Sequence, residues 1–280
     1  MDDAIVDNSQ VTTVTVAIDE ASSDDSFDDV ADQTVSVTTT DDDTPVVSFA
    51  SAASNGLESV SSANIVVGLD KASPNVVTVE YTVSGSATGS GTDYTLADGT
   101  LTFQANSTSE TITISSIVDD ALDENNETVI VTLSNPSNAT LGVNQVHTYI
   151  INDNDPSPKV SLSANPTIIG ENAGTSTITA TLDAVSGRDV MVTLGLSGTA
   201  TGSGTDYSIS TTTLFISAGS TTATATLSTV DDDLAEVTET IIVDITGVTN
   251  GLEDGIQQST VSISDDEVAG FTIVESGGNT

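Results

Sequence analysis

An internal repeat of about 112 residues is the feature that most constrains the fold of this chain. The segment "GSATGSGTDYT" begins at Gly85, and a near copy, "GTATGSGTDYS", begins at Gly198. Two acidic runs, "VDDALDENNETVIVTL" from Val118 and "VDDDLAEVTETIIVDI" from Val230, recur at nearly the same offset. Landmarks that keep their order and spacing indicate that one structural unit is built twice along the chain.

The repeat divides the 280 residues into four pieces. Residues 44–155 and 156–267 are predicted to be complete repeats. Residues 1–43 resemble the last part of a repeat, because "DDAIVDNSQVTTVTV" parallels the first acidic run, and residues 268–280 resemble an opening strand. We therefore expect a longer parent protein. The linker "INDNDPSPK" is short and contains proline, so neighbouring repeats should lie close together with limited swing.

Apolar residues within a repeat alternate with polar ones, which is typical of half-buried β-strands. In "NVVTVEYTVSG", one face carries Val77, Val79, Tyr81 and Val83. About seven such runs occur in about 110 residues, and no stretch keeps a helical period. The sequence predicts an all-β protein of tandem seven-stranded antiparallel β-sandwiches.

The charge balance excludes several classes of function. Forty-two acids face three bases, Lys71, Lys159 and Arg188, and the formal net charge is −39. Phosphate binding needs lysine and arginine, so nucleic acid is not expected as a partner, and an anionic membrane surface is disfavoured. No apolar run approaches the ~20 residues of a membrane span. The chain has no cysteine, which excludes disulfides and thiolate metal sites.

Four acidic elements recur in register in both complete repeats. They are an early glutamate, the aspartate of "GTDY", the acidic run after the fifth strand, and the acids that close the last strand. In a sandwich of this kind these elements should converge on one pole. Crowded carboxylates repel one another unless they are solvated or a cation neutralises them. Calcium takes 6 to 8 oxygen ligands and fits these residue types, but a solvated acidic surface stays open as an alternative.

The combination of motifs resembles the Calx-β family: an early "E", then "GTA…GTDY", then "VDD…E..E", then closing "DDD". The resemblance covers both complete repeats and most of residues 1–43. It implies a seven-stranded immunoglobulin-like sandwich that binds calcium at the acidic pole. Members of this family occur in the regulatory region of sodium–calcium exchangers, in an integrin β chain and in giant bacterial surface proteins.

The resemblance implies a set of calcium ligands in each repeat. In the first complete repeat these are Glu58, Asp93, Asp119, Asp120, Glu124, Glu127, Asp153 and Asp155. In the second they are Glu171, Asp206, Asp231, Asp232, Glu236, Glu239, Asp265 and Asp266, with Glu267 as a further possibility.

The sequence departs from this pattern at several positions. Asn154 replaces a closing aspartate, Asp123 has no acidic counterpart at Ala235, and Asp233 has none at Ala121. The sites are therefore expected to differ in affinity and in ion number. Residues 1–43 retain Asp2, Asp3, Asp41, Asp42 and Asp43 but lack the early glutamate and the "GTDY" aspartate, so they are not expected to form a complete site.

Catalysis has little support in the sequence. His147 is the only histidine, it lies in a predicted strand, and no nucleophile–base arrangement recurs around the matching position of the second repeat. "GSATGSG" lacks the lysine and the following helix of a phosphate loop, so it is interpreted as a turn between strands. The chain is not expected to be an enzyme.

Three functions remain open at this stage. The leading hypothesis is a calcium-stiffened spacer in a long extracellular bacterial adhesin or surface filament, which suits tandem modules without cysteine. The second is a calcium sensor that regulates an attached effector. The third is a carbohydrate- or protein-binding module, although aromatic residues make up only 3% of the chain. The expected partners are calcium ions, neighbouring repeats of the same chain and unidentified surface components, at an extracellular or cell-surface location.

Overall fold

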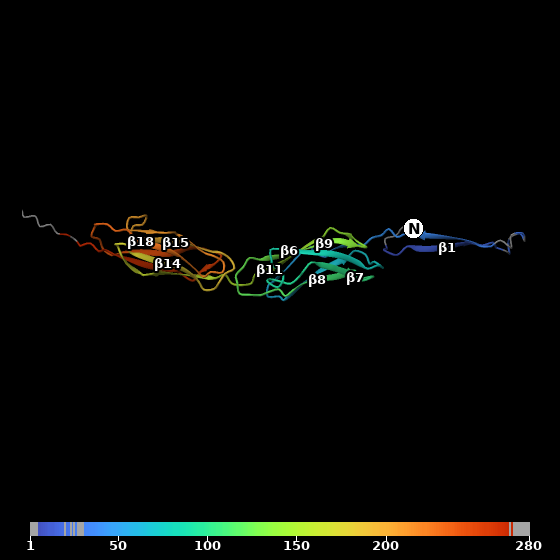
Figure 1. Ribbon diagram of the computed structural model, residues 1–280, viewed down its shortest axis with the longest axis horizontal. Helices are drawn as coiled ribbons and strands as arrows, with labels where there is room; N and C mark the ends of the chain where they lie inside the picture. The colour runs from blue at the N-terminus through green and yellow to red at the C-terminus, as the bar shows by residue number, and fades with distance from the viewer. Residues whose placement is uncertain are drawn as a thin grey trace, which may run out of the picture. The chain divides into compact units, whose positions relative to one another are not determined.

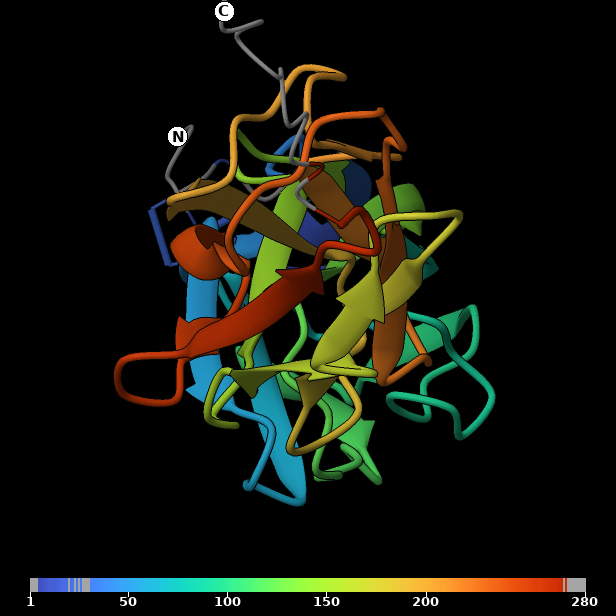
Figure 2. The same cartoon turned by 90° about the vertical axis from the view of Figure 1, so that its left-hand side faces the viewer.

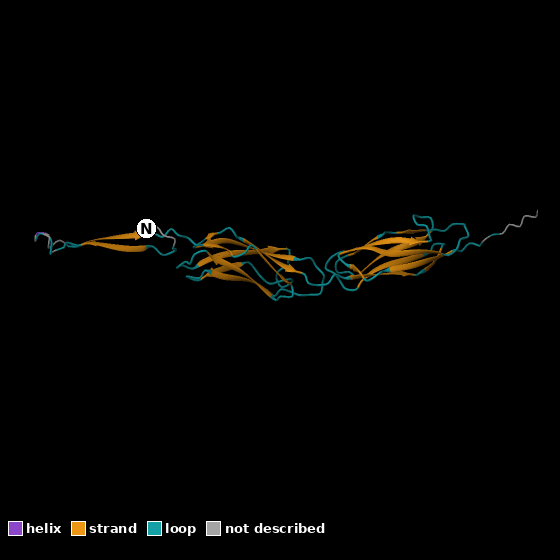
Figure 3. Ribbon diagram, turned by 180° about the vertical axis from the view of Figure 1, so that it is seen from behind, coloured by secondary structure: helices purple, strands orange, loops and turns teal. Residues whose placement is uncertain are grey.

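The computed structural model describes residues 5–19, 21, 22, 24, 26, 31–268 and 270. Its regular elements are β-strands (Figures 1 and 3). Asp2, Asp3 and most of the expected opening strand at 268–280 lie outside the described residues. Within the described part, no helix is long and apolar enough to cross a membrane. The described residues form two compact units, the first from residues 5–119 and 126–152 and the second from residues 120–125 and 153–270.

The first unit contains an isolated hairpin and a β-sandwich. Its strands are β1 (Gln10–Val16), β2 (Gln33–Thr39), β3 (Val46–Phe49), β4 (Ala53–Leu57), β5 (Ser62–Leu69), β6 (Val77–Gly85), β7 (Gly99–Phe103), β8 (Ser109–Ser115), β9 (Glu127–Ser137), β10 (Thr140–Leu141) and β11 (Val146–Asn152). The sandwich sheets have the orders β10-β3-β5-β8 and β4-β11-β9-β6-β7.

The second unit contains a similar β-sandwich. Its strands are coloured yellow to red in Figure 2. Its strands are β12 (Lys159–Asn165), β13 (Ile168–Gly170), β14 (Thr175–Leu182), β15 (Val190–Gly198), β16 (Tyr207–Ile209), β17 (Thr213–Ile216), β18 (Thr222–Thr229), β19 (Glu239–Thr249), β20 (Leu252–Glu253) and β21 (Gln258–Ser264). The sheets have the orders β16-β18-β14-β12-β20 and β13-β21-β19-β15-β17.

The predicted all-β sandwich is confirmed, but each sandwich has more than the seven strands expected, because the opening run splits and the short strands β10, β16 and β20 are added. The opening run of each repeat splits into two strands that join different sheets: β3 pairs with β5, while β4 pairs in parallel with the last strand, β11. In the second unit β12 and β13 divide in the same way. The ladders between the longer strands are antiparallel as expected, but the opening half-strand lies parallel to the last strand.

Alternating side chains of the two sheets form the core of each sandwich. The first core contains Phe49, Phe103 and Leu133, which are at most 2% exposed. The second core contains Ile178, Leu227 and Ile241, which are fully buried. Burying each such side chain contributes roughly 1.5–3 kcal/mol. The two sandwiches therefore have separate apolar interiors, as expected for independent domains.

The hairpin of β1 and β2 has the same register as the last two long strands of the sandwiches. Val14 lies opposite Val35, just as Val131 lies opposite His147 in the ladder of β9 and β11. Val131 is fully buried. In the hairpin Val14 and Val37 are each 50% exposed, since no second sheet covers that face among the described residues. One face of the hairpin therefore carries side chains that are buried at the matching positions of the complete sandwiches.

A glycine ends β6 and β15 at the same place in both sandwiches. Gly85 and Gly198 have φ angles of 132° and 124°, a region that side chains rarely adopt. A Cβ atom on Gly198 would lie 2.1 Å from the carbonyl oxygen of Thr240. That carbonyl also accepts a hydrogen bond from Ala200 N at 3.1 Å. The glycine allows the chain to turn tightly against the neighbouring strand.

We expect Gly198→Ala to destabilise the second sandwich by about 2–4 kcal/mol, because backbone strain and a clash with Thr240 act together. Urea unfolding of the full chain, followed by circular dichroism, measures the loss. Gly170→Ala is the matched control, since a Cβ there meets nothing within 4 Å. Equal unfolding midpoints for the two variants would contradict the assigned role of Gly198.

Candidate metal centre

The early glutamate of each repeat is buried beside the end of the last strand. Glu58 follows β4 and is 7% exposed, and Glu171 follows β13 and is 5% exposed. The backbone N–H of Glu58 donates to Asn152 O, and that of Glu171 donates to Ser264 O, each at 3.0 Å. The parallel pairing of the opening and last strands therefore positions this carboxylate.

The aspartate of "GTDY" closes a tight turn in both sandwiches. Asp206 N donates to Thr201 O at 2.9 Å, and the Asp206 carboxylate accepts a hydrogen bond from Thr201 N. Asp93 makes the same two contacts with Thr88. The carbonyl of Asp206 accepts a hydrogen bond from Val230 N at 2.9 Å, which places the start of the acidic run next to this turn.

Two carboxylates fix the backbone of the acidic run in the second unit, one from the run and one from the end of the last strand. Asp232 Oδ1 accepts a hydrogen bond from Leu234 N at 2.7 Å, an Asx-type turn. Asp265 Oδ1, at the end of the last strand, accepts one from Glu236 N at 3.1 Å. The run thus contacts the closing acids, as the predicted convergence on one pole requires.

Carboxylates of the second unit gather in three groups whose oxygens lie within 4.8 Å of one another. The groups are Glu171, Asp265 and Glu267; Asp206, Glu236 and Glu239; and Asp231, Asp266 and Glu267. All four acidic elements predicted from the sequence contribute to them. Asp232 belongs to none of the three groups, although its negative charge helps to raise the pKa of Glu171.

A small cavity of about 10 Å³ links the first two groups. Its lining consists of Glu171, Asp206, Glu236, Glu239 and Asp265, together with Val237 and Ile263. This volume is close to the space that one water molecule occupies. One Glu267 oxygen, Oε2, is buried and has no hydrogen-bond partner among the described residues. Carboxylate oxygens around a small space suit a hard cation such as calcium.

Mutual repulsion and burial shift the titration of these acids. Burial, followed by the charges of Glu267, Asp232, Asp265 and Glu236, raises the pKa of Glu171 to about 7. Burial also raises the pKa of Glu239, and its hydrogen bond to Asp206 adds to the effect. These glutamates would ionise readily beside a bound cation, because the cation favours the charged form.

The candidate ligands of the first repeat fall in both units. Glu58, Asp93, Asp119 and Glu127 belong to the first unit, whereas Asp120, Glu124, Asp153 and Asp155 belong to the second. Asp120 Oδ1 accepts a hydrogen bond from Leu122 N at 2.7 Å, which matches the turn at Asp232.

Two closing acids of the first repeat are also partly buried. Burial raises the pKa of Asp153, against the opposing effect of hydrogen bonds from the backbone of Glu124 and Asp155. Asp155 Oδ2 is buried and has no hydrogen-bond partner among the residues that the structure describes. This orphan oxygen matches Glu267 Oε2 at the aligned position of the second repeat.

Asp123, which has no acidic counterpart in the second repeat, forms an ion pair with Arg188. It is 3% exposed, and its carboxylate accepts hydrogen bonds from Arg188 Nε at 3.0 Å and from Ser157 Oγ at 3.2 Å. The sequence showed Asp123 as an irregularity without assigning it a partner. Its ion pair with Arg188 explains why it differs from the candidate ligands.

The two lysines are also paired with aspartates. Lys71 Nζ lies 2.7 Å from Asp43, and Lys159 Nζ lies 3.6 Å from Asp254. None of these three ion pairs includes a member of the carboxylate groups in the second unit. The predicted shortage of neutralising bases at the acidic pole is therefore seen directly in that unit.

Glu267 is the residue on which the sequence interpretation was weakest. It was only a further possibility, yet it contributes to two of the three carboxylate groups. The available signal was its alignment with Asp155, about one repeat length earlier.

His147 makes interior hydrogen bonds. It is 3% exposed, its Nε2 lies 2.8 Å from Ser54 Oγ, and its Nδ1 lies 2.7 Å from the carbonyl oxygen of Ser51. Its ring also lies 5.5 Å from that of Phe49. These contacts join the last strand to the opening segment, which is a structural use of the imidazole.

The strand topology defines tandem β-sandwich domains, and the second carries an acidic pole whose carboxylates could hold a metal ion. Residues 40–155 and 153–267 both match the model of the Calx-beta domain. The chain belongs to the Calx-beta family, and the resemblance seen in the sequence motifs is confirmed.

Several solved structures are similar to parts of the chain. CBD12 from CALX1.2 is 20% identical over 72% of this chain and 80% of its own, with a TM-score of 0.37. The apo-form Calx CBD1 domain is 24% identical over 40% of this chain and 100% of its own, with a TM-score of 0.37. The calcium binding domain CBD12 of CALX1.1 is 20% identical over 70% of this chain and 79% of its own, with a TM-score of 0.37.

The raised pKa of Glu171 predicts a pH dependence of stability in the absence of metal. The folded value of about 7 exceeds the ordinary value of 4.5, so the stability that this group contributes falls as the pH rises between them. Glu171→Gln cannot ionise and should stabilise the metal-free protein at pH 8 by about 1–2 kcal/mol, a figure that allows for screening by water at the loop.

Thermal unfolding in a chelator at pH 5 and at pH 8 tests this. Glu80→Gln is the control, because Glu80 is exposed and lies outside the carboxylate groups. The assignment is wrong if wild type and Glu171→Gln lose the same stability between the two pH values.

Proposed function

We propose that the two Calx-beta domains bind calcium at their acidic poles. The observation that carries the proposal is Glu171, a 5%-exposed glutamate whose pKa is raised by burial and by four neighbouring carboxylates. An oxygen-only ligand set and an ion-sized cavity support calcium over softer metals. In this proposal Glu171 and Asp265 supply the central oxygens of the second site, and Asp206, Glu236 and Glu239 supply the adjoining ones.

The same proposal covers the first repeat by alignment. Glu58, Asp93, Asp153 and Asp155 occupy positions that match Glu171, Asp206, Asp265 and Glu267. The shared backbone contacts of Glu58 and Glu171, and of Asp93 and Asp206, support this equivalence. The neutral Asn154 in place of a closing acid is expected to weaken or reduce ion binding there.

We further propose that these domains are spacers in a long extracellular or cell-surface bacterial protein, where calcium stiffens the junctions. Tandem copies of one sandwich without cysteine suit this role. The alternative of a calcium sensor differs in affinity and in what flanks the domains. A sensor would bind at about 10⁻⁷–10⁻⁵ M, whereas extracellular modules bind at about 10⁻⁴–10⁻³ M, so the measured affinity separates the two.

We also propose the domain boundaries 1–43, 44–155, 156–267 and 268–280. The register of β1 with β2 supports assigning residues 1–43 to the end of an earlier repeat, because it reproduces that of β9 with β11. The exposed Val14 and Val37 correspond to core positions of the complete sandwiches.

Calcium binding is tested by isothermal titration of the full chain. We expect ions to bind to both complete repeats, and we expect no third site of similar affinity from residues 1–43. Glu171→Gln and Asp265→Asn should each weaken binding to the second domain by about 10- to 100-fold or more, the range found even for groups that only orient metal ligands.

Asp233→Asn is the matched control, because Asp233 lies in the same acidic run but in none of the three carboxylate groups. It should leave the titration close to that of wild type. If Asp233→Asn and Glu171→Gln weaken calcium binding equally, the effect comes from overall charge and the assigned site is wrong.

Stiffening is a separate expectation that small-angle scattering of the full chain can measure. With calcium, the chain should show a narrower range of conformations, because the acids at "INDNDPSPK" become ligands in place of mutually repelling charges. Asp120→Ala and Asp153→Ala should each remove this effect without unfolding the cores. If the maximum dimension and the flexibility profile do not change with calcium, calcium is not the stiffener even where binding is confirmed.

A further inference from the structure

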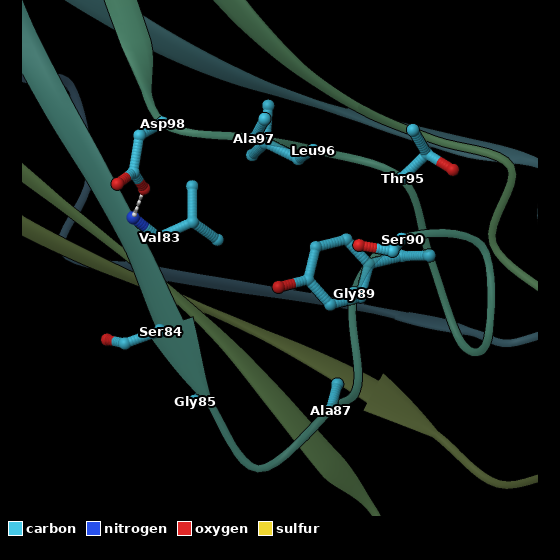
Figure 4. A pocket seen from close by; sticks show the side chains of 11 residues that line it. Val83, Ser84, Gly85, Ala87, Gly89, Ser90, Thr95, Leu96, Ala97 and Asp98 are labelled. Carbon is cyan, nitrogen blue, oxygen red and sulfur yellow. Dashed lines mark hydrogen bonds between the residues drawn. The ribbon is translucent and has the colours of Figure 1, made fainter.

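The first sandwich contains a cavity that differs chemically from the acidic cavity of the second sandwich. A space of about 420 Å³ opens between the end of β6 and the loop of residues 86–98 that leads to β7 (Figure 4). The usual range for small-molecule sites is about 300–1,000 Å³. The whole lining comes from residues 83–98, so the cavity belongs to one structural unit.

A tyrosine hydroxyl borders this cavity without a partner. Most of the Tyr94 side chain is buried, but its hydroxyl lies at the cavity and makes no hydrogen bond to any residue that the structure describes. The hydroxyl lies 3.5 Å from where a Cβ on Gly89 would stand, and Gly89 also lines the cavity. The missing side chain at Gly89 therefore leaves room beside the hydroxyl. The hydroxyl is therefore free to donate a hydrogen bond to a ligand oxygen in the cavity.

The neighbouring strand edge is protected against another strand. The pairing of β6 with β7 ends at Tyr81 and Gly99, so the last residues of β6 lack a strand partner on this side. The exposed N–H of Val83 instead donates to Asp98 Oδ1 at 2.7 Å, as the dashed line in Figure 4 shows. Charged side chains at a sheet edge discourage the addition of another strand, and here the carboxylate also occupies the N–H donor. The cavity is thus closed to an added strand while its interior stays open.

The lining selects the chemical class of the ligand. Val83 and Leu96 supply apolar surface, while Ser84, Ser90 and Thr95 supply hydroxyl groups. No basic side chain lines the cavity, and its one carboxylate, Asp98, already accepts a hydrogen bond. This lining disfavours an anion and suits an uncharged molecule that has several hydroxyl groups and an apolar face.

We propose that this cavity binds a neutral mono- or disaccharide, with the Tyr94 hydroxyl donating to a sugar oxygen. Sugars combine hydroxyl groups with C–H faces, and their size matches the cavity. The cavity lining includes none of the candidate calcium ligands, although Asp93, which is one of them, directly precedes Tyr94 in the same loop. In the second repeat the aligned positions keep Tyr207 and Gly202, but Thr211 replaces the edge-blocking Asp98.

Amide chemical-shift titration of the ¹⁵N-labelled, calcium-loaded full chain tests the proposal. The probes are glucose, galactose, N-acetylglucosamine and maltose. At least one should shift the amides of Gly85, Gly89 and Thr95 with a dissociation constant in the millimolar range, the level expected of a small polar ligand. Tyr94→Phe should weaken that binding by about 2- to 10-fold, the equivalent of one hydrogen bond, without loss of stability.

Two further variants make the test specific. Gly89→Leu should abolish binding by filling the cavity, and it should fold because a Cβ there meets Tyr94 only at ordinary contact distances of 3.5 Å or more. Tyr207→Phe, the matched change in the second sandwich, should leave the affinity unchanged. The proposal is overturned if no probe shifts these amides, if Tyr94→Phe and Gly89→Leu bind as wild type does, or if the peptide tri-alanine shifts the same amides and no sugar does.

Discussion

Repulsion among carboxylates is the constraint on which the acidic pole of the second sandwich depends. The chain has 42 acids and three bases, and each base is already paired with an aspartate outside the carboxylate groups of that unit. The fold nevertheless places Glu171 in the interior, beside the closing acids. Local hydrogen bonds hold these acids in place, since backbone N–H groups donate to the carboxylates of Asp206, Asp232 and Asp265. Such preorganisation costs stability without a cation and favours the bound state when one arrives.

Much of the fold could be predicted from the sequence because it depends on local periodicity. Val77 and Val79 are fully buried, as their alternation predicts, and the repeat correctly indicated two similar sandwiches. Tyr81 and Val83 are only partly buried, because the pairing of β6 with β7 ends there. The convergence of the acidic elements was predictable in the second unit because recurrence in register reveals positions that serve the same part of a fold.

Features that depend on single, non-repeated contacts could not be predicted. The ion pair of Asp123 with Arg188 joins residues 65 positions apart and has no copy that would make it stand out. The cavity beside Tyr94 arises from what is absent, namely a side chain at Gly89 and a longer β7. Its aligned counterpart differs at Thr211, so the two repeats share a scaffold but not every surface. The sequence repeat therefore predicts the architecture that both domains share, but it does not predict sites that occur in only one of them.

The parallel pairing of the opening and last strands also determines how each domain responds to force. Tension on the two ends of a domain pulls its opening and last strands in opposite directions along their length, so the hydrogen bonds between them are loaded together in shear. In the first domain β4 and β11 pair over five positions, from Ala53 to Leu57, whereas β13 and β21 pair over three, from Ile168 to Gly170. The second domain has the shorter mechanical clamp, and under tension it is the one that should yield first.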